Sequence, residues 1–285
     1  MWHQGCDPTP ARRPATVRIL TSVSVVMAAY NSEYTIGDAI RSVQNQTFLD
    51  WELIIVDDAS TDRTPDMVRP FLEDPKIQML VQPMNMGAGA ARNTGIGRSK
   101  ADLIAILDAD DLSLPHRLQM QFEEMIQHPQ MAVLSGHLAE FGTWGGPIVH
   151  HWPVASAEIQ ARIRRSKMPV AHGASMFRKA AFLAVGGYDE NCRRAEDFAL
   201  FRKLRASEFG CVDSVLLLYR TVRPISLQYA LVSGRDGRLA RVRNRDRFPR
   251  PSAKLQALPM SAPTDLRSII TWARRRFAER VRFES

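Results

Sequence analysis

The sequence predicts an α/β protein built on a mostly parallel sheet that helices cover on both faces. Apolar runs of strand length alternate with helical patterns from about residue 23 to residue 127, and these runs are almost continuously hydrophobic, as doubly covered strands are. The 285 residues are 45% hydrophobic and 24% charged, which is enough apolar material for a buried core. This composition excludes a disordered, collagen-like or coiled-coil chain. No apolar run approaches the roughly 18–20 residues that a membrane-spanning helix requires.

The first half of the chain predicts four strands, each followed by a helix. Val23 to Ala29 is the first apolar run, and Asn31 or Ser32 can cap the helix after it. Thr64 and Pro65 suit the N-cap and first position of the second helix. The predicted strands are 23–29, 53–56, 77–81 and 103–107, and the helices lie around 36–43, 64–72, 88–97 and 115–126.

The second half is less regular. Residues 135–172 are rich in glycine and proline, and they predict a long loop that holds a single helix at 158–166. Apolar patterns then predict a strand at 175–177, helices at 179–185 and 196–205, and a last strand at 215–219. We therefore expect a flexible leader over 1–20, one folded domain over 21–220 and a basic extension over 221–285.

The positive charge belongs to the end of the chain. Residues 221–285 hold 15 Lys and Arg against 5 Asp and Glu, so the remaining residues hold 23 against 25 and are close to neutral. The neutral body disfavours a nucleic-acid partner. In the extension, apolar residues recur at helical spacing beside arginines, which predicts an amphipathic helix on an anionic membrane surface. Packing of that apolar stripe on the body, or binding to a partner with an acidic groove, are the alternatives.

The number and spacing of the cysteines indicate the cellular compartment of the protein. Cys6, Cys192 and Cys211 are odd in number and widely spaced, which argues against a disulfide framework and against a zinc site. Residues 1–20 contain no apolar segment of the kind that a secretory signal has. We expect a cytoplasmic protein that is peripheral on the inner face of the membrane.

Acidic residues follow two of the predicted strands, at the edge where ligands of parallel sheets bind. Asp108, Asp110 and Asp111 come after the fourth strand, and hard carboxylate oxygens suit Mg²⁺ or Mn²⁺. A solvated turn with capping aspartates is the alternative. Asp57 and Asp58 end the second strand, where they could accept hydrogen bonds from a base or ribose, or only cap the next helix.

Three other places could carry chemistry. Residues 87–92 nearly spell a dinucleotide-binding fingerprint, but Arg92 replaces its third glycine; it could face a diphosphate instead. Glu196 and Asp197 begin a helix, where acids are favoured by the helix dipole alone; at a site, one would be a general base. His172 is the histidine best placed to contact the site, although most such histidines only pack.

Seven segments together resemble glycosyltransferase family 2, the inverting, nucleotide-sugar-dependent enzymes of the GT-A fold. The resemblance covers about residues 22–220, and the order and spacing of the segments make it specific. The segments are VSVVMAAYN (23–31), SVQNQTF (42–48), WELIIVDDASTD (51–62), NMGAGAARN (85–93), LDADD (107–111), GGYDE (186–190) and AEDF (195–198).

The resemblance implies a nucleotide site at the ends of the first two strands. Ala28 and Tyr30 would line the nucleobase pocket. Asp58 would accept a hydrogen bond from the base N–H, with Asp57 beside it.

The resemblance also implies the catalytic groups. Asp108 would hold the ribose or the water shell of the metal, Asp110 would ligate Mg²⁺ or Mn²⁺ on the diphosphate, and Asp111 lies next to it. Asp197 would take the proton of the acceptor hydroxyl. Family members often carry a histidine after the last strand, but this chain reads YRTVRP over 219–224, so Arg220 or Arg223 could bind phosphate in its place.

The function expected from this resemblance is inverting transfer of a sugar from a nucleotide diphosphate sugar, with UDP favoured, to a hydroxyl of a glycan or lipid-linked acceptor in cell-surface glycan or glycolipid synthesis. A nucleotidyltransferase would also place metal-bound acids on such a sheet, but it predicts a basic, glycine-rich phosphate loop near the first strand, which residues 30–34 lack. A non-catalytic nucleotide-binding protein is the third alternative, and the full set of acids disfavours it.

Overall fold

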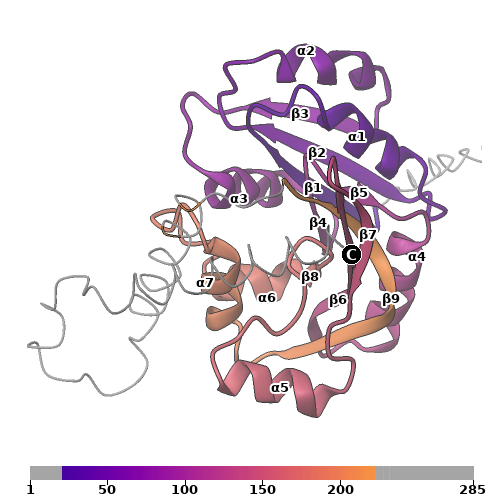
Figure 1. Cartoon of the computed structure of the whole chain (residues 1–285), viewed down its shortest axis with the longest axis vertical. Coiled ribbons are helices and arrows are strands. Elements are labelled where there is room, and N and C mark those ends of the chain that lie inside the picture. The colour runs from indigo at the N-terminus through magenta and orange to yellow at the C-terminus, as the bar shows by residue number, and fades with distance from the viewer. Residues whose placement is uncertain (1–20, 223–226, 228–230, 232–285) are drawn as a thin grey trace, which may run out of the picture.

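The computed structural model describes residues 21–222, 227 and 231 (Figure 1). The expected leader over 1–20 and nearly all of the expected basic extension, including its amphipathic helix, lie outside these residues. The described residues therefore correspond to the predicted folded domain over 21–220.

The first half folds as the alternating pattern predicts. Helix α2 ends earlier than the predicted 64–72 helix and continues as a 3₁₀ turn, because Pro70 has no N–H to donate to the helical ladder. A short strand, β5, was not predicted; it pairs with β9. The elements are β1 (Val23–Ala29), α1 (Ile36–Gln44), β2 (Trp51–Asp57), α2 (Thr64–Val68), η1 (Arg69–Glu73), β3 (Ile77–Val81), α3 (Ala88–Arg98), β4 (Leu103–Asp108), β5 (Leu112–Ser113) and α4 (Arg117–Gln127).

The second half contains more strand than the sequence predicts. Much of the expected loop over 135–172 is a hairpin of two strands, whose second strand begins with Gly145 and Gly146 at positive φ. The last strand begins at Glu208 rather than Val215. The elements are β6 (Met131–Gly142), β7 (Gly145–His150), α5 (Ser156–Arg164), β8 (Met176–Arg178), α6 (Lys179–Ala184), α7 (Glu196–Lys203) and β9 (Glu208–Arg220).

The nine strands within the described residues form one sheet in the order β3-β2-β1-β4-β8-β6-β9-β5, with β7 added to β6. Strands β3, β2, β1 and β4 are mutually parallel, as are β6 and β9, while β8 runs antiparallel to both of its neighbours. Ala29 pairs in register with Asp57, and Ala28 pairs with Asp108. The carboxyl ends of β1, β2 and β4, and therefore their polar residues, meet at one edge.

Helices cover both faces of the sheet, as predicted (Figure 1). Val25 and Met27 of β1 pack in a cluster with residues of α1, α2 and α4. Val26 between them points to the other face, in a cluster with residues of α3, α5, α6 and α7. Each fully buried side chain of this size stabilises the fold by about 1.5–3 kcal/mol, so the two clusters hold the strand ends firmly in place.

Helix α3 lies very close to the sheet. A Cβ on Gly95 would stand 2.6 Å from Cγ1 of Val26 and 3.2 Å from Cγ2 of Val56. The small residues of the 85–93 segment and the glycine that follows it in α3 thus serve close packing, one of the roles that the sequence suggested for small residues here. This packing places Arg92, near the middle of α3, beside the end of β4.

Candidate active site

Three carboxylates follow β4 at the edge where the parallel strands end. We call Asp108, Asp110 and Asp111 the carboxylate cluster. The N–H of Asp111 donates to the carbonyl of Asp108 at 3.1 Å, which closes a turn that holds the three side chains near one another. Asp111 is fully buried: its Oδ1 accepts from the Arg220 N–H at 2.8 Å, and its Oδ2 has no partner. A Cβ on Gly173 would lie 3.5 Å from that oxygen, in ordinary van der Waals contact.

The carboxylates of the cluster do not ionise independently. Burial, followed by the charges of Asp108 and Asp110, raises the pKa of Asp111 well above its ordinary value. Desolvation, followed by the charge of Asp108, raises the pKa of Asp110 to about 6, although its side chain is exposed. For Asp108, burial is the largest influence and favours a higher pKa, but the charge and hydrogen bond of Arg92, together with weaker effects of His172 and Arg117, hold the pKa below its ordinary value. Raised carboxylate pKa values in one cluster mean that a cation there would be stabilised.

Arg92 joins the carboxylate cluster to helix α7. Its side chain is 6% exposed; one terminal nitrogen donates to Asp108 at 2.6 Å and the other donates to Glu196 at 2.8 Å. The guanidinium also lies 5.6 Å from the ring centre of Tyr188. The sequence indicated that Arg92 could face a diphosphate; in the structure its two terminal nitrogens donate to the carboxylates of Asp108 and Glu196. The buried cation thus links elements that are far apart along the chain.

Asp197 lies in the first turn of α7, next to the Glu196 that Arg92 holds. Ala195 enters the helix in the left-handed conformation, with φ of 58°. Burial, followed by the charge of Glu196, raises the pKa of Asp197 to about 6, while the N–H of Phe198, 2.6 Å from Oδ1, acts in the opposite direction. At neutral pH Asp197 is ionised and yet basic enough to accept a proton, which is what a general base requires.

His172 lies beside this network rather than in it. Its Nε2 is 2.8 Å from the Tyr188 hydroxyl, and burial, followed by the charge of Arg92, lowers its pKa to about 3. His172 is therefore neutral and positions Tyr188. Asn93 holds Tyr188 from the other side: its Oδ1 accepts from the Tyr188 N–H at 2.9 Å, and its Nδ2 donates to the Tyr188 carbonyl at 3.1 Å.

Sequence reasoning did not single out Tyr188 or Asn93. Each belongs to a segment quoted for the resemblance, GGYDE over 186–190 and NMGAGAARN over 85–93. A Cβ on Gly187 would approach Oδ1 of Asn93 to 2.7 Å, so the close approach of the two segments requires a glycine there. Both segments could be identified in the sequence, but the role of Tyr188 and Asn93 follows only from the contact that the fold makes between them.

The predicted nucleotide residues meet at the ends of β1 and β2. Tyr30, after β1, is 47% exposed, and Ala28 lies in β1 itself. Asp57 is buried and accepts from the Ser60 hydroxyl and N–H. The two oxygens of Asp58 accept from the N–H groups of Met86 and Gly87, at 2.8 and 2.7 Å. Both aspartates thus shape neighbouring loops, and Asp58 ties the loop before α3 to the end of β2.

Arg220 closes the carboxylate cluster from the end of β9. Besides its N–H bond to Asp111, its Nε donates to the Asp110 carbonyl at 2.8 Å, and its guanidinium carbon lies 4.7 Å from the ring centre of Phe141. The positively charged guanidinium of Arg220 therefore lies at the edge of the cluster. Arg223, the second candidate for phosphate, lies outside the described residues.

The described part of the chain contains no group of three or more His, Cys, Asp or Glu side chains arranged to hold a metal ion by themselves. Within the same residues, no helix combines the length and hydrophobicity needed to cross a membrane. The fold brings together eight of the predicted site residues, and four more occupy the neighbouring strand ends. The eight are Asp108, Asp110, Asp111, Arg92, Glu196, Asp197, His172 and Arg220, and the four are Ala28, Tyr30, Asp57 and Asp58.

This fold and its acidic strand end define a GT-A glycosyltransferase. The fold matches the mannosyltransferase PcManGT from Pyrobaculum calidifontis, solved with GDP-Man and Mn²⁺, with a TM-score of 0.61 and 18% identity over 88% of this chain and 74% of that one. Residues 24–186 match the family model described as Glycosyl transferase family 2. The chain belongs to this family, as its sequence segments indicated.

Two relatives refine this placement. EpsE of Bacillus subtilis (strain 168), named as a glycosyltransferase, is 33% identical over 205 residues, which are 70% of this chain and 72% of EpsE. An Escherichia coli protein, UDP-Glc:alpha-D-GlcNAc-diphosphoundecaprenol beta-1,3-glucosyltransferase WfgD, is 40% identical over 106 residues, or 37% of this chain and 42% of WfgD. The second match therefore spans less than half of either protein.

Proposed function

We propose that this glycosyltransferase moves a sugar, with inversion, from a nucleotide diphosphate sugar to a hydroxyl of a cell-surface glycan or glycolipid. The observation that supports this most directly is the pairing of two acidic sites through one buried cation. The carboxylate cluster offers oxygen ligands at the end of β4, and Asp197 offers a base on α7, while Arg92 contacts both Asp108 and Glu196. The diphosphate of the donor would lie at the carboxylate cluster, and the acceptor hydroxyl would lie at Asp197.

In the proposed reaction Asp197 accepts the proton of the acceptor hydroxyl as its oxygen bonds to the anomeric carbon. The bond from that carbon to the diphosphate oxygen breaks, and its electron pair leaves with the nucleoside diphosphate. One displacement inverts the anomeric configuration. A single protein base suffices, unlike the carboxylate pairs of glycoside hydrolases. Glu196 is held by Arg92 and its charge raises the pKa of Asp197, so it serves as a positioning residue.

The residues present fit a Mg²⁺ or Mn²⁺ ion. Oδ2 of Asp111 is buried without a partner, and the pKa of Asp110 is raised, so both would gain from a nearby cation. Asp110 is the proposed ligand, with Asp108 contacting the ribose or the ion's water. Because no described group of side chains encloses an ion, the diphosphate would supply further oxygens. When bound, the ion would neutralise charge on the leaving diphosphate.

The donor is proposed to be a UDP-sugar, with Ala28, Tyr30, Asp57 and Asp58 at the nucleobase. The name of WfgD, which specifies UDP-Glc, supports UDP, whereas PcManGT was solved with GDP-Man. Exposed Tyr30 offers an aromatic face for stacking at the end of β1. Arg220 is proposed to contact phosphate, since its guanidinium stands at the edge of the carboxylate cluster.

The C-terminal extension is proposed to hold the protein on an anionic membrane surface at the cytoplasmic face, close to a lipid-linked acceptor. Its 15 Lys and Arg against 5 Asp and Glu over 221–285 support this. The test replaces Arg274, Arg275 and Arg276 with Gln in the full chain and measures co-sedimentation with phosphatidylglycerol vesicles. Binding should weaken in the variant and in high salt; unchanged binding would remove the extension from this role.

The function itself is tested with a panel of nucleotide sugars. UDP-Glc, UDP-GlcNAc and GDP-Man are incubated with the full chain and Mn²⁺, and release of nucleoside diphosphate is measured with and without candidate acceptors. We expect a UDP-sugar to be turned over, and the product's anomeric configuration, read by NMR, to be opposite to the donor's. Retention of configuration would refute the single-displacement mechanism. Turnover of GDP-Man alone would refute the UDP assignment.

A further inference from the structure

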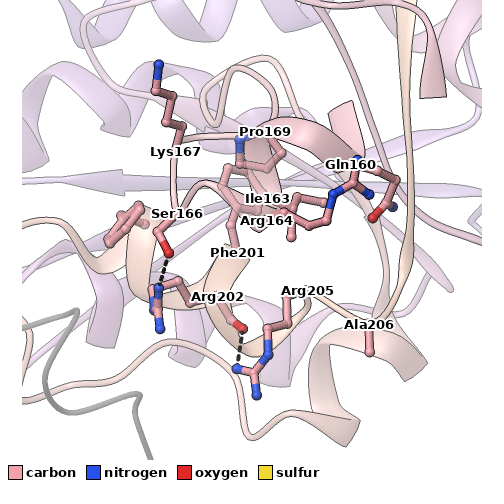
Figure 2. Close-up of a pocket in the computed structure, with 11 residues that line it drawn as sticks. Gln160, Ile163, Arg164, Ser166, Lys167, Pro169, Phe201, Arg202, Arg205 and Ala206 are labelled. Atoms are coloured by element: carbon pink, nitrogen blue, oxygen red, sulfur yellow. Dashed lines mark hydrogen bonds between the residues drawn. The ribbon is translucent and has the colours of Figure 1, made fainter. Parts of the chain in front are cut away.

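A pocket of about 430 Å³ lies beside α7 (Figure 2), and no residue of the carboxylate cluster is among its described lining residues. Helix α5 and the segment after it form one wall, and another is formed by Phe198, Phe201 and Arg202 of α7 together with Arg205 in the turn that follows the helix. Phe198, Phe201 and Arg202 lie at positions i, i+3 and i+4, which is one side of a helix. The volume falls within the range of small-molecule sites in proteins.

The lining of this pocket, which we call the α5–α7 pocket, is cationic. Arg164, Lys167, Arg202 and Arg205 contribute to it, and its eleven described lining residues include no Asp or Glu. Arg202 donates to the Ser166 hydroxyl at 2.9 Å, and Arg205 donates to the carbonyl of Arg202 at 3.2 Å (Figure 2). These bonds orient the two guanidinium groups before any ligand arrives. Guanidinium and ammonium groups together favour phosphate oxygens.

Part of the lining of the α5–α7 pocket is apolar. Ile163, Pro169, Phe198 and Phe201 contribute this part. A free inorganic anion would leave this surface without a partner, whereas a phosphate that carries a hydrocarbon chain would cover it. The pocket therefore offers a matching surface for each half of an amphiphilic phosphate: cationic side chains for the phosphate and apolar side chains for the hydrocarbon chain.

One lining residue of the pocket is next in sequence to the proposed base. Phe198 lines the pocket and Asp197 precedes Phe198 in α7, so their Cα atoms are about 3.8 Å apart. We propose that the α5–α7 pocket binds the phosphate group and the first part of the hydrocarbon chain of an amphiphilic phosphate. Two sources share this chemistry: the prenyl diphosphate of a lipid-linked acceptor, which rests on the proposed function, and the head group of an anionic membrane lipid.

The first experiment measures binding of farnesyl diphosphate to the full chain by calorimetry. EDTA is present to remove divalent cations, so that the carboxylate cluster repels a diphosphate instead of binding it. Inorganic diphosphate and farnesol are the probes that lack one half of the ligand. The pocket variant is Arg164→Gln with Lys167→Gln, at two exposed lining positions. The matched control is Arg98→Gln with Arg165→Gln, two exposed arginines that are not among the lining residues, so it removes the same charge.

We expect farnesyl diphosphate to bind the wild type about tenfold or more tightly than either partial probe, and the pocket variant to weaken this by about tenfold, as for two lost contacts to an anion. The control should change the affinity less than about threefold. Two results would overturn the proposal. One is an equal loss of farnesyl diphosphate affinity in both variants. The other is that the wild type does not bind farnesyl diphosphate and that the two variants bind vesicles equally.

A second arm separates the two sources. Both variants are sedimented with vesicles of phosphatidylcholine containing phosphatidylglycerol. Weaker vesicle binding of the pocket variant than of the control, with farnesyl diphosphate affinity unchanged, identifies a membrane head group as the ligand. Nucleotide-sugar hydrolysis should be unchanged in both variants. If the wild type turns over no donor but still binds farnesyl diphosphate through Arg164 and Lys167, the proposed function fails while the pocket stands.

Discussion

Arg92 offers the sharpest test of the described network, because it is the cation between two acidic elements. We consider Arg92→Met, which keeps the aliphatic stem and removes the charge. The change deletes hydrogen bonds of 2.6 Å to Asp108 and 2.8 Å to Glu196, whose side chains are 28% and 14% exposed. Removing one partner of a buried ion pair costs about 3–5 kcal/mol. Since Asp108 is partly exposed, we expect about 3 kcal/mol, the lower end of that range.

The pH dependence separates charge from packing. In the wild type the pKa of Asp108 is depressed, so its contribution to stability is present above the pKa of the unfolded state and is lost only as pH falls through the lower folded value. In the variant, burial acts without Arg92 and raises that pKa, so the ionised carboxylate is penalised at neutral pH and relieved as it becomes protonated. The stability difference between the two proteins should therefore shrink on acidification.

The assay is urea unfolding of the full chain at about pH 7 and about pH 5, with midpoint and slope compared between wild type and variant. Arg98→Met, at an exposed position of the same helix, is the control and should change stability by no more than about 0.5 kcal/mol. A loss below about 1 kcal/mol for Arg92→Met, or a loss of equal size at both pH values, would refute the account of Arg92 as the charge that balances Asp108 and Glu196.

Three further changes test other parts of the molecule. Asp197→Asn should leave donor binding nearly intact and lower kcat about 10²–10⁴-fold; in the wild type, kcat/KM should fall below about pH 6 as Asp197 becomes protonated, and a flat acidic profile would contradict its role as the base. Asp110→Asn should weaken Mn²⁺-dependent nucleotide binding, measured by calorimetry with and without Mn²⁺, and wild-type affinity would contradict the metal assignment. Gly95→Ala should destabilise the fold by about 1–3 kcal/mol in urea unfolding, because its Cβ would stand 2.6 Å from Val26. Gly97→Ala on the same helix meets no atom within 4 Å and should instead stabilise slightly; equal effects of the two glycine changes would contradict the close packing of α3.

The strands that sequence reasoning missed lie in the second half of the domain. The expected loop over 135–172 contains most of β6 and all of β7, and β9 begins at Glu208 rather than Val215. Glycines and prolines mark turns, but the strands between them are not periodic enough to be recognised alone. Strands β6 and β9 form because they pair with each other, over residues that are more than 70 positions apart, and β7 is then added to β6 as a hairpin. Such non-local pairing leaves little trace in a local pattern.

The sequence by itself determined the strand-helix alternation of the first half and the positions of its acids. Apolar runs such as Val23–Ala29 are buried on both faces, and an acid that directly follows such a run must stand at the edge of the sheet. Asp57 and Asp108 can thus be assigned to one edge from their places in the chain, because parallel strands end on the same side. Local chemistry is sufficient for such assignments.

The tertiary structure alone decided how these groups act on one another. Arg92 contacts Glu196 across 104 positions of the chain, and the raised pKa values of Asp110 and Asp197 follow from burial and from neighbours that the fold brings close. The α5–α7 pocket likewise exists only because Arg164 and Phe198 lie on helices that the fold brings side by side. Electrostatic interaction and burial depend on distances in space, and these are set by the packing of the whole domain rather than by any segment of its sequence.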